Sequence, residues 1–371
     1  MKLQKRNLLI ITGTRAEYGL FRSTILKLKK SQQLNVKLLV TGMHTLKHYG
    51  LTINEVKKDF HIDRVVPIKE SDDMPTALSK EIAGINGYVA KKHIDAILVI
   101  GDRDEPFAAA TVGIHRNIPV IHVSGGDESG LTVDHYLRNA ITVFSKLHLV
   151  QTQRSKTNVI TLGADPKSVY VVGSAGLDGL KGAALFGRVE IARQLKLNTK
   201  AKWVLAIQHP TPFEKFSFTQ QIGSIVSTLK RQPGEKIIVY PNADTGSDVF
   251  VLALQKLDGK TGFHLFKNLN HKLFLSLVCH CDVFIGNSSS GLMEAGFLKT
   301  PFVLVGNRQK SREAGNNVIP VDYQPQQIIK AISWALSAAF QRKLAVGRPA
   351  YQGGDVSGTI VKKIEAFFKL I

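Results

Sequence analysis

Short apolar runs alternate along the whole chain with longer segments that carry one apolar face. The runs consist mainly of Val, Ile and Leu and are almost continuously apolar. Such strands, separated by helices, are typical of a parallel sheet covered by helices on both faces. We therefore predict a doubly wound α/β fold. The expected strands cover residues 7–12, 36–40, 96–100, 120–123, 147–150, 169–172, 204–208, 236–240, 283–285 and 302–305. The expected helices include residues 20–31, 74–91, 107–116, 218–231 and 325–340.

The predicted strands form two groups, six before and four after a glycine-rich segment at residues 173–178. Together they are too many for one such sheet without a break, and single cores stop growing at about 250–300 residues. We predict two Rossmann-like domains, residues 1–178 and 179–356. Ligands of open α/β sheets sit at the carboxyl ends of the strands, so we expect the site in a cleft where the two sheets face each other.

Charge changes the picture of possible partners. The chain has 49 Lys and Arg against 29 Asp and Glu, a formal net charge of +20. This excess fits an acidic partner such as a nucleotide, a nucleic acid or an anionic surface, and equally an ordinary basic surface. No nucleic-acid-binding motif is present, so a nucleic-acid partner ranks last.

The two cysteines, Cys279 and Cys281, flank His280. On a strand, alternation would point both thiols away from the imidazole, and three such ligands do not fill a structural zinc shell. We expect no metal site, unpaired thiols and a reducing compartment. The apolar run at residues 8–11 is cut short by residues 12–15, and no run reaches the ~18 apolar residues of a membrane span. We expect a cytoplasmic protein without a membrane partner.

The first predicted strand leads into Thr-Gly-Thr-Arg-Ala-Glu-Tyr-Gly at residues 12–19. Gly13 at the strand end would let a ligand approach the backbone, and Arg15 would offer a forked donor to a phosphate. Many strand–helix turns look similar, and the segment is not the Gly-x-Gly-x-x-Gly fingerprint, so a nicotinamide cofactor is not implied.

A serine-rich turn, Gly-Asn-Ser-Ser-Ser-Gly at residues 286–291, follows the strand at 283–285. The hydroxyls of Ser288, Ser289 and Ser290 and the backbone at Gly291 would bind a diphosphate where a helix opens at residue 292. Glu294 would accept hydrogen bonds from ribose hydroxyls. The alternative is ordinary helix capping, for which Ser and Asn are preferred.

Basic side chains and one histidine follow neighbouring strands. Arg308 and Arg312 lie in a loop that could reach the same anion or remain solvated. His209 ends the strand at 204–208, which would point its imidazole into the cleft, although a lone histidine can equally be structural.

Acidic residues gather at two strand ends in the first half of the chain. Asp102 closes the strand at 96–100, and Asp127, Asp134 and His135 follow the strand at 120–123. Paired acid/base chemistry requires one group that loses a proton and another that donates one, and a shared site can separate their pKa values. Surface loops are often acidic, but clustered acids run against the composition of this basic chain.

In this order, the motifs resemble those of the hydrolysing UDP-N-acetylglucosamine 2-epimerases of the sialic-acid branch. The resemblance covers residues 12–19, 41–44, 101–103, 125–127, 134–142, 208–210, 286–291 and 308–313. It implies a glycosyltransferase-B-like fold, with a C-terminal helix at residues 357–371 that packs back on the first domain and has Ser357 as its N-cap.

The resemblance also implies a reaction. UDP-N-acetylglucosamine becomes N-acetylmannosamine and UDP, by elimination of UDP to a glycal and rehydration, for nonulosonic acid biosynthesis. It implies no cofactor and a homodimer or homotetramer. Asp102 and Asp134 match catalytic acids. The residues that match positions holding the UDP are Arg15, His209, Ser289, Ser290 and Glu294, with Arg308 and Arg312 nearby, and we expect His44 to bind the substrate as well. We also expect a catalytic role for His209, which with Arg15 would balance the negative charge on the departing diphosphate.

This chain departs from the resemblance near the expected chemistry. Ser124 stands where the sialic-acid enzymes carry a catalytic glutamate, and a serine is no comparable proton shuttle. We expect Asp127, Glu128 or His135 to take over one proton transfer, or the substrate to differ. The alternatives are the same reaction on a UDP-2,4-diacetamido-2,4,6-trideoxyhexose of the legionaminic-acid pathway, a UDP-sugar glycosyltransferase, and a non-catalytic UDP-sugar-binding protein.

Overall fold

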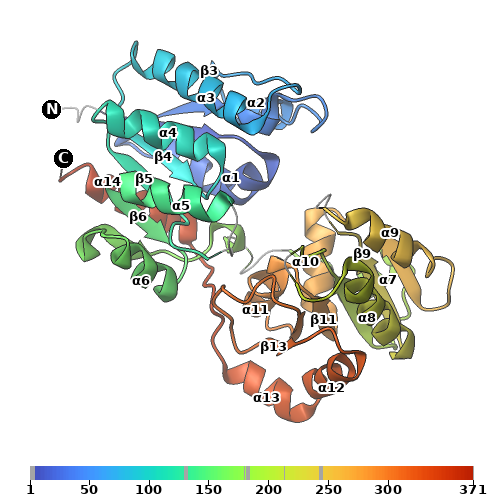
Figure 1. The fold of residues 1–371 in the computed structure, drawn as a ribbon. Coiled ribbons are helices and arrows are strands. Elements are labelled where there is room, and N and C mark those ends of the chain that lie inside the picture. The colour runs from blue at the N-terminus through green and yellow to red at the C-terminus, as the bar shows by residue number, and fades with distance from the viewer. Residues whose placement is uncertain are drawn as a thin grey trace. The chain divides into compact units, whose positions relative to one another are not determined.

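The chain forms two compact units in a computed structural model (Figure 1). The structure describes residues 5–128, 133–178, 180, 184–212, 214–241 and 245–370, so the expected boundary after residue 178 falls at the edge of a described segment. Unit 1 comprises Met1–Lys181 and Gln352–Ile371, and unit 2 comprises Gly182–Tyr351. Each unit is an α/β layered structure around one parallel sheet, which confirms the predicted fold class.

Unit 1 contains a seven-stranded parallel sheet in the order β3-β2-β1-β4-β5-β6-β7. Its strands are β1 Arg6–Thr12, β2 Leu34–Val40, β3 Arg64–Val65, β4 Ala96–Ile100, β5 Val120–Val123, β6 Leu147–Val150 and β7 Val169–Val171. Its helices are α1 Arg15–Lys30, α2 Ile53–Asp59, α3 Met74–Val89, α4 Asp104–His115, α5 Val133–Phe144, α6 Gln153–Thr161 and α14 Val356–Phe367.

Unit 2 contains a six-stranded parallel sheet in the order β10-β9-β8-β11-β12-β13. Its strands are β8 Trp203–Ile207, β9 Glu235–Val239, β10 Phe263–Phe266, β11 Val283–Gly286, β12 Phe302–Val305 and β13 Val318–Val321. Its helices are α7 Arg188–Leu195, α8 Phe218–Arg231, α9 Ser247–Gln255, α10 His271–His280, α11 Glu294–Phe297, α12 Pro325–Ala335 and α13 Ala338–Val346. Counted from its own first strand, the sheet of unit 2 has the Rossmann order 3-2-1-4-5-6, and the sheet of unit 1 has the same order with a seventh strand, β7, added beside β6.

Alternate residues of β1 show why the strands are apolar throughout. Leu8 and Ile10 pack in the core cluster that contains α1 and α14 side chains. Leu9 and Ile11 pack in the opposite cluster, with side chains of α3 and α4. Because helices cover both faces of the sheet, neither side of the strand tolerates polar residues.

Several sequence-based predictions of elements are wrong. The strands β3, β10 and β13 are missing from the prediction, and the single helix expected at 325–340 is two helices. The second begins after Ser337, whose hydroxyl accepts a hydrogen bond from the backbone N–H of Phe340. Cys279 lies on α10 and Cys281 caps that helix, so neither cysteine is on the expected strand. Both thiols are free.

The helix α14 returns to unit 1 and packs on α1 (Figure 1). The hydroxyl of Ser357 lies 2.8 Å from that of Thr24 on α1. The Asp178 carboxylate accepts hydrogen bonds from the backbone N–H groups of Val356 and Ser357 at 3.1 and 3.2 Å. Asp355 rather than Ser357 is the N-cap, which corrects the prediction.

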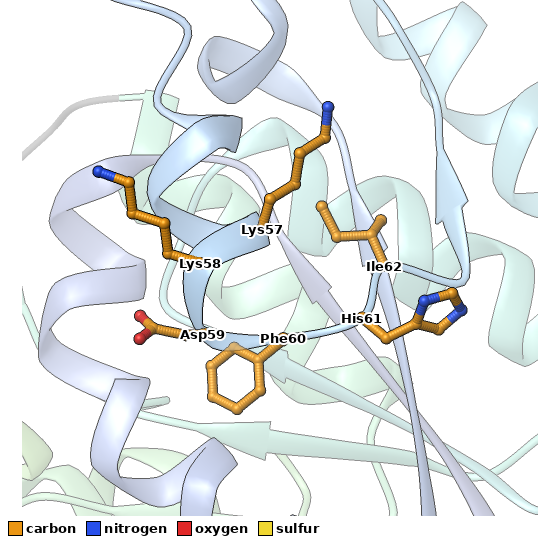
Figure 2. Close-up of a pocket in the computed structure, with 6 residues that line it drawn as sticks. All are labelled: Lys57, Lys58, Asp59, Phe60, His61 and Ile62. Carbon is orange, nitrogen blue, oxygen red and sulfur yellow. The ribbon is translucent and has the colours of Figure 1, made fainter.

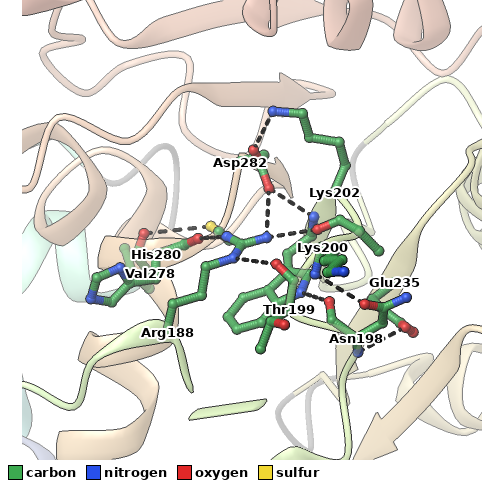
Figure 3. Close-up of polar contacts among 12 residues, drawn as sticks. Arg188, Asn198, Thr199, Lys200, Lys202, Glu235, Val278, His280 and Asp282 are labelled. Carbon is green, nitrogen blue, oxygen red and sulfur yellow. Dashed lines mark hydrogen bonds and ion pairs between the residues drawn. The ribbon is translucent and has the colours of Figure 1, made fainter. Parts of the chain in front are cut away.

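In unit 2, Arg188, the first residue of α7, contacts the two segments that lead into β8 and β11 (Figure 3). Its guanidinium donates hydrogen bonds to the carbonyl oxygens of His280 and Ala201, both at 2.7 Å, and of Thr199 at 3.2 Å. The same group lies 3.9 Å from the centre of the Trp203 ring. One planar cation thus satisfies carbonyl groups of the segments that lead into β8 and β11.

A buried glutamic acid joins α3 to the end of β2. Glu81 is 1% exposed, and its Oε1 lies 3.2 Å from the hydroxyl of Thr41. Thr41 has one hydroxyl proton, and its shorter contact, 2.7 Å to the carbonyl oxygen of Val66, takes that proton. The contact with Glu81 therefore requires a proton on the carboxyl group. Burial and the nearby charge of Glu105 raise the pKa of Glu81 to about 8.

This raised pKa predicts that the protein loses stability as the pH rises towards 8. The carboxyl group ionises near its ordinary pKa in the unfolded chain but near pH 8 in the fold, so each pH unit between the two values costs up to ~1.4 kcal/mol. Glu81→Gln keeps a donor for Thr41 and stays neutral, so its thermal unfolding midpoint should fall less between pH 5.5 and pH 8.5.

Glu190→Gln is the matched control. Its exposed carboxylate pairs with Arg193, and its pKa is lowered to about 2, so it is ionised in both states over this range. Its pH profile should match the wild-type profile. A profile of Glu81→Gln as steep as the wild-type profile would contradict a protonated Glu81.

Candidate active site

An ion pair joins two of the strand-end segments in unit 1. Asp102 follows β4, and its carboxylate accepts a hydrogen bond from the guanidinium of Arg138 on α5. The Arg138 side chain is 3% exposed, and it also donates to the carbonyl oxygen of Asp127 at 2.5 Å. The structure therefore brings the predicted residues Asp102 and Asp127 together around one buried cation.

Two further predicted residues, Asp134 and His135, lie in the first turn of α5. The amide nitrogen of Asn139, one turn later, is 3.2 Å from Nε2 of His135. The other ring nitrogen, Nδ1, is buried and has no hydrogen-bond partner among the described residues. Residues 129 and 130 of the acidic segment, with 131 and 132, lie outside the described residues.

Of the residues that could replace the missing glutamate, Glu128 is held in other contacts. Its carboxylate pairs with Arg154 at 2.7 Å and accepts a hydrogen bond from Asn158 at 3.3 Å. The hydroxyl of Ser124 accepts a hydrogen bond from the side-chain amide of Gln151 at 2.8 Å. His135 differs in having a buried ring nitrogen, Nδ1, without a hydrogen-bond partner among the described residues.

A buried carboxyl group that was not predicted from the sequence packs against the turn after β1. Glu105, on α4, is 3% exposed and accepts a hydrogen bond from Nε of Arg103 at 3.3 Å. A Cβ on Gly13 or Gly42 would lie 2.4 or 2.2 Å from Glu105 side-chain atoms. Gly13 was expected to make room for a ligand; the room is taken by Glu105. Burial raises the pKa of Glu105.

The predicted ligand residues of this turn differ in their exposure. Arg15 begins α1, and its side chain is 72% exposed, with Nε 3.2 Å from a Glu55 oxygen. His44 is fully buried, and its ring nitrogens lie 3.2 and 2.8 Å from the hydroxyls of Thr12 and Thr52. Burial lowers the pKa of His44 to about 4. Arg15 is free to reach an anion beyond Glu55, whereas His44 supports the turn.

In unit 2, one buried amide joins the ends of β8 and β11. The side-chain oxygen of Asn287 accepts the backbone N–H of His209 at 2.7 Å, and its nitrogen donates to the carbonyl oxygen of His209 at 2.8 Å. The backbone carbonyl of Asn287 accepts a hydrogen bond from Gln309 at 3.0 Å. Asn287 thus holds together the three loops that carry His209, the serine turn and the arginine pair.

Gly286, the residue before Asn287, is required because β11 passes very close to the end of β8. Gly286 has φ +130°, and a Cβ there would lie 1.9 Å from the carbonyl oxygen of Ile207. Only glycine allows β11 to pass so near the end of β8.

The serine turn is not the simple helix start that the sequence predicted. Ser289–Gly291 form a 3₁₀ turn, and the four-residue helix α11 starts at Glu294. The hydroxyl of Ser288 caps the turn by accepting from the backbone N–H of Ser290. Ser289 and Ser290 are half-buried. Capping therefore accounts for one of the three serines.

The charges in unit 2 differ from expectation at one residue. Burial, with the nearby charge of Arg308, lowers the pKa of His209 to about 4. His209 is therefore neutral at pH 7 and cannot balance a negative charge as a cation. Arg308 and Arg312 are the cations on the loop that Gln309 fixes to Asn287. Burial raises the pKa of Glu294.

Other parts of the described structure contribute little to this site. A surface hollow of about 500 Å³ lies at the end of α2, lined by residues 57–62, and contains none of the predicted site residues (Figure 2). Within the described ranges, no group of three or more His, Cys, Asp or Glu side chains could hold a metal ion. No helix in those ranges is long and apolar enough to cross a membrane.

Comparison with known structures supports the fold of both units. A putative UDP-N-acetylglucosamine 2-epimerase from Listeria monocytogenes matches with a TM-score of 0.82 at 20% identity, over 98% of this chain and 97% of that chain. The UDP-N-acetylglucosamine 2-epimerase from Neisseria meningitidis, solved with UDP-N-acetylglucosamine bound, matches with a TM-score of 0.80 at 20% identity, over 96% and 99%.

Comparison with known sequences identifies the family. The UDP-N,N'-diacetylbacillosamine 2-epimerase (hydrolyzing) of Legionella pneumophila is 34% identical over 337 residues, covering 90% of this chain and 89% of the relative. The polysialic acid biosynthesis protein P7 of Escherichia coli is 32% identical over 336 residues, covering 88% and 85%. The sequence model of the UDP-N-acetylglucosamine 2-epimerase family matches residues 26–365 of this chain. The chain therefore belongs to the UDP-N-acetylglucosamine 2-epimerase family.

Proposed function

We propose that this chain releases UDP from a UDP-linked 2-acetamido sugar and converts the sugar to its 2-epimer. A base takes the C2 proton, the C1–O bond to UDP breaks, and a C1=C2 double bond forms. Water then adds its hydroxyl group to C1, while a proton returns to C2 on the opposite face. One UDP-sugar and one water give UDP and the 2-epimeric sugar, and no redox cofactor takes part.

Two substrates fit this reaction. The first is UDP-N-acetylglucosamine, which would give N-acetylmannosamine. The second is UDP-N,N'-diacetylbacillosamine, a UDP-2,4-diacetamido-2,4,6-trideoxyhexose. The name of the 34% identical Legionella relative and the presence of Ser124 in place of a catalytic glutamate support the second. We propose the diacetamido sugar as the preferred substrate.

The observation that carries the proposal is the ion pair between Asp102 and Arg138. A guanidinium stays protonated at every physiological pH, and buried in unit 1 it needs an anionic partner. Asp102 is therefore available as a carboxylate, a proton acceptor. We assign it the removal of the C2 proton.

A second group must return a proton to C2. The candidates are Asp127, Asp134 and His135. His135 carries the buried, unpartnered Nδ1, which can exchange a proton without breaking a contact with a described residue. We assign His135 this role in place of the family glutamate, with Asp134 beside it on α5.

We assign UDP to the loops that Asn287 joins. Ser289, Ser290 and the backbone at Gly291 would donate to the diphosphate, and Arg308 and Arg312 would supply positive charge. His209, which is neutral at pH 7, would act as a hydrogen-bond donor to the leaving oxygen. Arg15 would add a charge-assisted contact.

Substitution of Asp102 tests the proposed base. Asp102→Asn should lower the rate of UDP release by about a thousandfold, since general bases contribute 10²–10⁴-fold. The rate is measured by a coupled assay for UDP with each of the two sugars. Asp95→Asn is the matched control. Asp95 also pairs with an arginine, Arg6, at 3.1 Å, but it precedes β4 and so lies at the amino-terminal ends of the strands, opposite to Asp102.

The control should keep its rate of UDP release within about twofold of wild type, although its unfolding midpoint falls. Wild-type turnover by Asp102→Asn would show that Asp102 is not the base. UDP release only after a sugar acceptor is added would favour a glycosyltransferase. Binding of UDP with no release from either sugar would favour a non-catalytic binding protein.

The serine turn is tested by UDP affinity alone. Ser289→Ala combined with Ser290→Ala should raise the Kd for UDP at least about a hundredfold, because two hydrogen bonds to a charged group contribute ~1.5–3 kcal/mol each and ~1.4 kcal/mol is a factor of ten. Isothermal titration calorimetry measures this Kd. Ser337→Ala, which removes a helix cap elsewhere in unit 2, should leave it unchanged. An unchanged Kd in the double variant would rule out the proposed diphosphate site.

A further inference from the structure

A fully buried histidine contacts both elements that form the Asp102–Arg138 ion pair. His122 is the third residue of β5. Its Nε2 lies 2.8 Å from the carbonyl oxygen of Gly101, the residue before Asp102. Its Nδ1 lies 3.2 Å from the hydroxyl of Thr142, which follows Arg138 by one turn of α5. One imidazole ring therefore bridges the turn after β4 and the helix that supplies the cation.

The two partners fix where the ring proton lies. A carbonyl oxygen can only accept, so Nε2 of His122 carries the proton and donates it to Gly101. The other nitrogen, Nδ1, then accepts from the Thr142 hydroxyl. Burial lowers the pKa of His122 to about 3, and the neighbouring ring of His148 on β6 acts in the same direction. The ring is therefore neutral at pH 7, and its role is to hold geometry rather than to move protons.

The same ring limits the backbone around the candidate carboxylates. Gly101 has φ +77°, and its N–H donates to the carbonyl oxygen of Val123 at 3.0 Å. A Cβ on Gly125, in the loop that leads to Asp127, would lie 2.7 Å from Nδ1 of His122. Arg138 holds the side chain of Asp102 through its carboxylate. His122 holds the backbone from which that side chain extends, through the carbonyl oxygen of Gly101.

We infer that His122, with Thr142, is the positioning residue that sets the place of the Asp102 carboxylate relative to the substrate. The inference rests on the proposed function, in which Asp102 is the base. A base must lie within hydrogen-bond reach of the proton it removes, and a shift of about 1 Å can cost a hundredfold in rate. Neither residue touches the substrate in this account.

Matched variants separate positioning from stability. Thr142→Val is almost isosteric but removes the hydroxyl donor, whereas Thr142→Ser keeps it. His122→Phe removes both ring contacts, whereas His122→Gln can still donate to Gly101 through its amide. Thr24→Val removes a buried hydroxyl contact between α1 and α14, away from the strand ends, and reports the effect of lost stability alone.

We expect His122→Phe to lower kcat about a hundredfold and Thr142→Val about tenfold, with KM and the Kd for UDP within twofold of wild type. His122→Gln and Thr142→Ser should each retain at least half of the rate that His122→Phe and Thr142→Val lose, on a logarithmic scale. Thr24→Val should lower the unfolding midpoint without lowering kcat. If His122→Phe does not fold, the two Thr142 variants carry the test.

Unchanged kcat in Thr142→Val and His122→Phe, or an equal loss in Thr24→Val, would overturn the inference. The proposed function fails separately, if the wild-type enzyme releases no UDP from either sugar. Nitrogen-15 NMR of the His122 ring, assigned by its loss in His122→Gln, needs no turnover. A proton on Nε2 supports the bridge between Gly101 and Thr142, and a proton on Nδ1 overturns it.

Discussion

The buried guanidinium of Arg138 is the constraint on which the candidate chemistry of unit 1 depends. A permanent cation with a 3% exposed side chain needs acceptors, and it has the Asp102 carboxylate and the carbonyl oxygen of Asp127. Removing one partner of such a pair costs about 3–5 kcal/mol, because the remaining charge is buried alone. The same contact that stabilises α5 on the sheet therefore keeps a carboxylate ionised at the end of β4.

In unit 2, a neutral side chain, the amide of Asn287, holds the strand-end loops in place. The amide of Asn287 has both an acceptor and donors, and it satisfies the backbone of His209 on the neighbouring strand end. An amide adds no charge of its own beside the cations Arg308 and Arg312 of the adjoining loop. Both units thus position their strand-end loops with one buried polar side chain, but only unit 1 fixes an ionised acid by doing so.

Apolar continuity predicted the central strands well. Each central strand is buried on both faces, and its sequence therefore contains almost only Val, Ile and Leu. The missed strands lack this pattern: β3 has two residues, β10 is half-buried along its length, and β13 contains Pro320 at an edge. These three strands lie at sheet edges, where a strand buries less, and no local apolar run marks them; the fourth edge strand, β7, has such a run and was predicted.

Candidate site residues could be chosen from the sequence where a motif ends a strand, as at Asp102 and the serine turn, and their roles stay predictions. Residues whose role depends on packing were not. Glu105 is one acid among several in its segment, and only the fold shows that its side chain fills the space beside Gly13 and Gly42. His122 lies within an apolar strand, and its bond to Gly101 joins residues that are 21 apart in sequence. The loss of charge on His209 likewise comes from burial, which the sequence does not show.

The most direct test of the central claim, an ionised base that removes the C2 proton, is the reaction run in deuterated water and followed by proton NMR. With the diacetamido UDP-sugar or UDP-N-acetylglucosamine, we expect free UDP together with a manno-configured sugar that carries deuterium at C2. Release of UDP with the C2 proton retained in the product would contradict it, because hydrolysis would then have occurred without proton removal.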